Sequence, residues 1–172
     1  MRAGLAALMV PALLAASQVG AATAAAPAKA PETARWQLIE GTDQVTGGIG
    51  LRWLKIGGDT DTPVGLLACR RPSGIYVSAD GIPPKPAAPA VDLLVSGKGF
   101  AVPVGTPAQE GKSVEAVGAT PAGLLDALET AGTIQLMYGA QSSGVFQAPD
   151  PRVMKGFITV CRQIEGEHGQ GG

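Results

Sequence analysis

The sequence predicts a mainly β protein: an antiparallel β-sandwich or open barrel with a short inserted helix and a C-terminal helix. Apolar and polar residues alternate over many short segments, which is the period of a half-buried strand. Glycine, proline and aspartate separate these segments at short intervals, and this spacing favours antiparallel strands over parallel βαβ units. Two segments depart from the strand period, and both fit the period of a helix instead.

The expected strands follow one another along most of the chain. After the fifth of them, the turn Ser96–Gly99 leads straight into the sixth, which predicts a hairpin. The apolar positions that alternate are Trp36 and Leu38; Ile49, Leu51 and Trp53; Val64, Leu66 and Ala68; Ile75, Val77 and Ala79; Val91, Leu93 and Val95; Phe100, Val102 and Val104; Val114 and Ala116; and Ile134, Leu136 and Tyr138.

The inserted helix is expected in the stretch TPAGLLDALETAG. Thr120 is suited to the N-cap, Pro121 to the first helical position and Gly132 to the residue after the end. Its apolar face consists of Leu124, Leu125 and Leu128.

The C-terminal helix is expected to begin at Pro151, with Asp150 as its cap. Apolar residues then recur at spacings of four, four and three, which places Cys161 on the buried face. A strand through the stretch FITVC is the alternative, favoured by β-branched residues and by Gly156. The residues at the helical spacing are Val153, Phe157, Cys161 and Ile164.

The N-terminal residues have the order of a secretory signal peptide. Met1 and Arg2 give a positively charged start, an apolar run follows, and small residues after it offer sites for a signal peptidase. We expect a signal peptide over residues 1–26, cleaved between Ala21 and Ala26. The alternative is a segment that stays uncleaved and anchors the protein in a membrane.

The rest of the chain is expected to form one domain. A disordered leader over residues 27–34 precedes a single β-rich domain over 35–165, and a disordered tail over 166–172 follows it. The chain contains no asparagine and is rich in alanine, glycine and proline, which indicates a GC-rich bacterial genome. We therefore expect a protein exported to the periplasm of a Gram-negative bacterium.

The two cysteines are expected to form a disulfide between Cys69 and Cys161. The periplasm is oxidising, and an even number of cysteines leaves none unpaired. Closing so long a loop contributes ~4.5 kcal/mol in the chain-entropy model. Two buried free thiols are the alternative. A redox or metal role needs a CxxC motif or ligating histidines, and the one histidine, His168, lies in a glycine-rich tail.

Charge and motifs set aside several functions. The formal net charge of −1 provides no positive field for nucleic acid. A serine hydrolase needs a base such as histidine, and the sequence contains no GxSxG motif. Asp59 and Asp61 have the spacing of a calcium loop, but its other ligands are missing, so a polar turn is expected. We expect neither a metal nor a cofactor.

Arginines next to the cysteines form a candidate anion patch. If the disulfide forms, Arg70, Arg71 and Arg162 are expected to approach one another, and clustered guanidinium groups bind carboxylate or phosphate. The alternative is that these arginines are solvated or paired with acidic residues. The proline-rich segment Gly81–Ala90 is either a docking segment or a stiff loop that protects a sheet edge.

The C-terminal part resembles a known family. An early tryptophan, a strand at Ile134–Leu136, a following Gly144–Phe146 step, Pro149 and a helix opening with Gly156 and Phe157 are similar to the invasion-associated locus B family. These are small exported β-sandwich proteins of alphaproteobacteria. The resemblance implies an envelope protein and no active site.

The function expected from these observations is that of a binding or scaffolding accessory protein of the cell envelope, not an enzyme. Its expected partner is another envelope protein, with membrane contact only if the N-terminus stays uncleaved. One alternative is an enzyme that works through carboxylates, such as Asp80 and Asp92 on facing strands. Another is an envelope protein anchored by its N-terminal helix.

Overall fold

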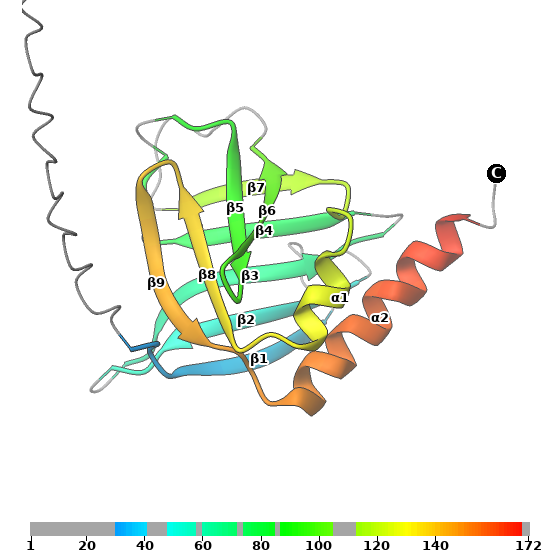
Figure 1. Ribbon diagram of the computed structural model, residues 1–172, viewed down its shortest axis with the longest axis horizontal. Coiled ribbons are helices and arrows are strands. Elements are labelled where there is room, and N and C mark those ends of the chain that lie inside the picture. Colours follow the sequence, from blue (N-terminus) through cyan, green and yellow to red (C-terminus); the bar gives the residue numbers. More distant parts are fainter. Residues whose placement is uncertain are drawn as a thin grey trace, which may run out of the picture.

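Two antiparallel sheets make up most of the protein, and their strands run crosswise to each other (Figure 1). The structure is a computed structural model that describes residues 30–40, 48–57, 60–71, 74–84, 87–104 and 113–169, without the side chains of 167–169. The expected signal peptide and the first residues of the leader lie outside these ranges. The predicted fold class, mainly β with an inserted and a C-terminal helix, is confirmed.

The first sheet contains five strands in the order β1-β2-β3-β4-β7. Its first four strands form a meander in which each strand pairs with the next in sequence, and β7 then adds to β4. The strands are β1 (Ala34–Glu40), β2 (Ile49–Lys55), β3 (Thr62–Cys69), β4 (Ile75–Asp80) and β7 (Ser113–Gly118).

The second sheet contains four strands in the order β6-β5-β8-β9. The predicted hairpin between β5 and β6 is confirmed, and Ser96 and Gly97 both have positive φ, as a tight hairpin turn requires. β9 is the strand that the sequence patterns do not predict, because its serines and glycine interrupt the alternation. The strands are β5 (Ala90–Val95), β6 (Lys98–Pro103), β8 (Thr133–Tyr138) and β9 (Gln141–Gln147).

The two sheets are joined along both sides. On one side, Glu32 donates its amide to the carbonyl of Val145 at 2.7 Å and accepts from the amide of Gln147 at 2.9 Å, before the chain enters β1 of the other sheet. On the other side, β6 and β7 are neighbours, and a Cβ on Gly118 would lie 2.8 Å from the ring of Pro103. Ordered pairing thus begins at Glu32, earlier than the expected domain start at residue 35.

The inserted helix α1 (Leu124–Glu129) is shorter than the sequence predicts. Thr120 is not its cap, because Pro121–Gly123 form a turn and Gly123, at φ 75°, adopts the left-handed conformation just before the helix. The predicted apolar face is confirmed, since Leu124, Leu125 and Leu128 are all buried.

The C-terminal helix α2 (Pro151–Gly169) confirms the helical prediction, and the alternative strand through FITVC is wrong. Asp150 caps it, accepting a hydrogen bond at Oδ1 from the amide of Arg152 at 2.8 Å. The helix begins before Gly156, where the family resemblance places its opening, and continues into the expected disordered tail. It packs against β2, β3 and α1 (Figure 1).

The main hydrophobic core lies between the sheets and beneath α2. A second, smaller cluster of Leu66, Ala68 and Tyr76 lies on the outer face of the five-stranded sheet. Val64 belongs to the main core rather than to this outer cluster, because a bulge between Trp53 and Leu54 breaks the alternation of the paired strands. The largest fully buried side chains are Trp53, Tyr138, Phe146 and Phe157.

Candidate functional site

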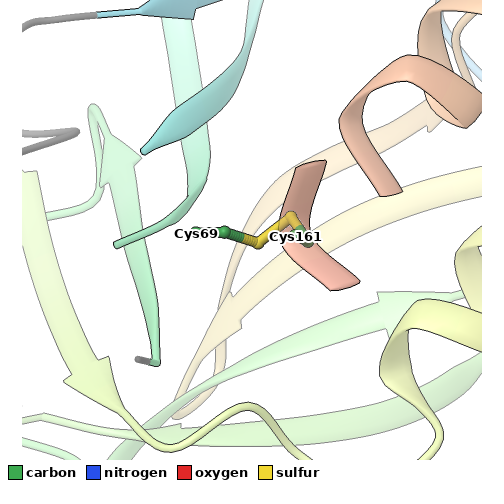
Figure 2. The surroundings of a disulfide bond; sticks show 2 residues. All are labelled: Cys69 and Cys161. Atoms are coloured by element: carbon green, nitrogen blue, oxygen red, sulfur yellow. A yellow bond between two sulfur atoms is a disulfide. The ribbon is translucent and has the colours of Figure 1, made fainter. Parts of the chain in front are cut away.

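Cys69 and Cys161 form the predicted disulfide, which links the end of β3 to α2 (Figure 2). Their Cα atoms lie 5.4 Å apart, and both residues are buried. Leu67 and Cys69 point into the main core, while Leu66 and Ala68 point outward. The disulfide is therefore a structural bond inside the core.

Arg162 is paired with acidic residues, as the alternative interpretation of the arginines expects. Its Nη1 donates to Glu129 Oε1 at 2.6 Å, and its Nη2 donates to Asp126 Oδ1 at 2.7 Å. The hydrogen bond to Glu129, followed by the one to Asp126, raises the pKa of Arg162. The pairs join α2 to α1 at the surface, where such ion pairs contribute little to stability.

Arg70 lies on the opposite side of the five-stranded sheet from α2. Successive residues of a strand point to opposite faces, so Arg70 points away from Cys69 and its guanidinium lies 5.7 Å from the centre of the Tyr76 ring. Arg70 thus contacts Tyr76 on the outer face, whereas Arg162 contacts α1, because the disulfide joins inner faces. The contribution of Arg71 stays a prediction.

The two aspartates named for the alternative enzyme lie on different sheets and point to different faces. Asp80 points outward from the five-stranded sheet, in line with Tyr76 and Ser78. Asp92 points outward from the other sheet, between the buried Val91 and Leu93. Stacked sheets lie about 10 Å apart before side chains that point away from each other are counted. The two carboxylates therefore point away from each other.

The expected polar turn uses Asp61 for an ion pair. Its Oδ2 lies 2.8 Å from Nη1 of Arg35. Asp59 and the side chain of His168 lie outside the described residues. In the described part of the chain, no three acidic, histidine or cysteine side chains are grouped so that they could hold a metal ion.

The proline-rich segment is partly packed onto the second sheet. Ile82 is buried, the Ala88 amide donates to the Tyr138 hydroxyl at 2.9 Å, and Gln141 Nε2 donates to the Pro83 carbonyl at 3.2 Å. The residues 85–86 between these contacts lie outside the described ranges. The contacts support a structural role for this loop.

A recess on the outer face of the five-stranded sheet is lined by side chains from three strands, and its polar side chains come from β2 and β4. It has a volume of about 230 Å³. Strand pairing places three of its residues in one row across the sheet: Arg52 on β2 lies opposite Leu66 on β3, and Leu66 lies opposite Ser78 on β4. The residues that line the recess are Arg52, Pro63, Leu66, Tyr76, Ser78 and Asp80.

The base of the recess is unusual for an exterior sheet face. Ser78 is 6% exposed and is the one buried polar residue among those described, although its side chain points away from the core. Its hydroxyl donates to Asp80 Oδ1 at 3.3 Å. Within the described ranges, the guanidinium of Arg52 has no hydrogen bond or ion pair. The recess thus presents a donor, a hydroxyl and a carboxylate together.

Tyr76 forms one wall of the recess and remains a neutral phenol over the physiological range. Burial, followed by the negative charge of Glu115 and a hydrogen bond to its carboxylate, raises the pKa of Tyr76 to about 12. A hydrogen bond with Ser78 acts in the opposite direction and is weaker. The sequence signal for this site is the alternation of Tyr76, Ser78 and Asp80 along β4, but only the strand order shows that Arg52 joins them.

The raised pKa of Tyr76 predicts a loss of stability at alkaline pH. The unfolded chain releases this proton near pH 10, whereas the folded protein holds it until about pH 12. The unfolded state then binds fewer protons, so the free energy of unfolding falls as the pH rises through this window, by about 2 kcal/mol. Urea unfolding at pH 9, 10, 11 and 12 should show that the free energy of unfolding declines less steeply with pH for Tyr76→Phe than for the unchanged protein. Equal slopes would contradict the assignment.

Comparison of the chain with protein-family models, with curated proteins and with solved structures finds no match. Neither helix in the described ranges combines the length and apolar character that crossing a membrane requires. The geometry of the site is therefore the basis for a functional proposal.

Proposed function

We propose that this chain is an exported accessory protein of the Gram-negative cell envelope, which binds a partner in the periplasm. Two features support export. The N-terminal sequence has the order of a signal peptide, and the Cys69–Cys161 disulfide suits an oxidising compartment. The resemblance to the invasion-associated locus B family is in line with the same location.

The recess on the outer face of the five-stranded sheet is the observation that carries the binding role. Its polar side chains project from β2 and β4, which β3 joins into one hydrogen-bonded sheet, so the backbone that carries them is in place before any partner arrives. The disulfide ties β3 to α2 behind this surface. A preformed polar recess on a rigid scaffold is suited to recognition.

The proposed partner is another envelope protein. The recess holds both a guanidinium and a carboxylate, which is typical of the mixed charge of a protein contact. The chain as a whole has a net charge of only −1, so association driven by a strong electrostatic field is not part of the proposal.

Export is tested by expressing the full chain in a Gram-negative host and measuring the intact mass of the periplasmic fraction. We expect a mass that corresponds to cleavage between Ala21 and Ala26, lowered further by the two hydrogens lost when the disulfide forms. A full-length mass in that fraction would refute the cleavage, and recovery of the protein only from the cytoplasm would refute export.

Binding is tested by comparing proteins captured from an envelope extract by three baits. The first is the unchanged protein, the second carries Arg52→Gln and Asp80→Asn in the recess, and the third carries Arg152→Gln and Asp92→Asn as a control of equal charge change. We expect one envelope protein to be retained by the first and third baits and lost from the second. Equal retention by all three would show that the recess is not the binding surface.

A further inference from the structure

The chemistry of the recess narrows the group that it can receive. Arg52 supplies a planar guanidinium from β2, and the hydroxyl of Ser78 lies at the base of the recess, close to the outward face of Leu66. A guanidinium beside a hydroxyl forms short, charge-assisted hydrogen bonds with a carboxylate or a phosphate. The first requirement on an occupant is therefore a negative oxygen group.

The acidic side chains discriminate between these two anions. Asp80 lines the same recess, and the carboxylate of Glu115 lies close enough to Tyr76 to raise the pKa of its phenol. A doubly charged phosphate would face the carboxylates of Asp80 and Glu115, and like charges in a partly buried site repel strongly. A carboxylate carries a single charge and is repelled less, and the guanidinium groups of Arg52 and of Arg70, which lies 5.7 Å from the centre of the Tyr76 ring, supply positive charge on this face.

The free oxygens of Asp80 add a second requirement, which is a hydrogen-bond donor close to the carboxylate. Asp80 receives one hydrogen bond from Ser78, at the long distance of 3.3 Å, and a carboxylate can accept several. A peptide chain carries an amide N–H next to its terminal carboxylate. The side chains of Leu66 and Pro63 provide an apolar surface for the side chain of a last residue.

Size points in the same direction. A recess of about 230 Å³ is below the range of about 300 to 1,000 Å³ that holds a drug-sized ligand, so it admits the end of a chain rather than a whole ligand. We propose that the recess binds the C-terminal carboxylate of a peptide chain, with Arg52 on the carboxylate and Asp80 on the adjacent amide. Ser78 then exchanges its long hydrogen bond to Asp80, 3.3 Å, for one to the bound carboxylate. This inference rests on the proposed binding function, and it defines which part of a partner enters the site.

The probe that tests it is N-acetyl-trialanine with a free carboxylate, titrated into the ¹⁵N-labelled protein and followed by NMR. The same peptide with a C-terminal amide differs only in the charged group. We expect the free acid to shift the amides of β2, β3 and β4 around Leu66 and Ser78, and to bind at least about tenfold more tightly than the amidated peptide. Equal affinity of the two peptides would overturn the inference, as would the absence of shifts in these strands.

Variants separate the roles of the side chains. Arg52→Gln should weaken the binding of the free acid by about tenfold or more and leave the weak binding of the amidated peptide unchanged. Arg152→Gln, on the exposed face of α2, should bind both peptides as the unchanged protein does. Asp80→Asn should weaken the binding of both peptides, because Asp80 contacts the amide N–H rather than the carboxylate. Loss of binding in the Arg152→Gln control would overturn the assignment.

Two further titrations distinguish which molecule supplies the anionic group. Inorganic phosphate that bound as tightly as the free acid would overturn the carboxylate assignment and favour a general anion site. Unacetylated trialanine that bound much more tightly than its acetylated form would assign the recess to small free peptides rather than to a protein C-terminus. The acetylated peptide could fail to bind while the unchanged bait still captures an envelope protein that the bait with the altered recess loses. In that case the carboxylate inference fails and the proposed binding function stands.

Discussion

Replacing both Cys69 and Cys161 by alanine should lower the free energy of unfolding by about 4.5 kcal/mol. The bond closes a loop of 92 residues, and its removal allows the unfolded chain many more conformations. Loss of packing adds to this, since both cysteines are at most 2% exposed. Urea unfolding of the two proteins, followed by tryptophan fluorescence, measures the difference.

Reduction provides the control for this double substitution. A thiol reductant should destabilise the unchanged protein by a similar amount and have no effect on the double alanine variant. A loss below about 1 kcal/mol in the variant would mean that the bond adds little beyond the packing of α2.

Gly65→Ala should destabilise the protein by about 3 kcal/mol, although alanine is better suited to a strand than glycine. A Cβ at this position would lie 2.6 Å and 2.8 Å from the Trp53 ring and 2.8 Å from Leu136 Cδ1. Both neighbours are fully buried, so neither can move without disturbing the packing between the two sheets. The midpoint of urea unfolding should fall accordingly.

Gly99→Ala is the matched control for this substitution. Gly99 also lies within a strand, but a Cβ there would meet no atom within 4 Å. The same change of residue should therefore leave stability unchanged or raise it by up to about 1 kcal/mol. Similar losses at both positions would show that strand glycines are needed for the backbone rather than for the space that Gly65 leaves to Trp53.

Periodicity in the sequence predicts most of the fold because each strand and helix buries one face. Ile49, Leu51 and Trp53 illustrate this, since their alternation along β2 puts all three in the main core. β9 escapes prediction because Ser142, Ser143 and Gly144 have no apolar alternation, and their strand forms by pairing with β8. The start of α1 escapes because the left-handed turn at Gly123 replaces the expected cap.

The candidate site could not be predicted because it depends on which strands are neighbours. Alternation shows that Ser78 and Asp80 share a face, yet only the register between β2, β3 and β4 brings Arg52 beside them. The directions of Arg70 and Arg162 could not be predicted for a related reason. Proximity along the chain to a disulfide does not mean proximity in space, because Arg70 and Cys69 belong to opposite faces of one sheet.

The chain visits its two sheets in alternation, and this order limits when a chain emerging N-terminus first can fold. β4 cannot pair with β7, nor β5 with β8, until the later strand has emerged, and strands of the other sheet lie between the members of each pair in the sequence. Until β8 and β9 emerge, the meander β1–β4 exposes unpaired strand edges and an uncovered apolar face, which is when a chain is most prone to aggregate. Cys161 arrives later still, on the last helix, so covalent closure comes at the end of emergence and seals a fold that is acquired late and cooperatively.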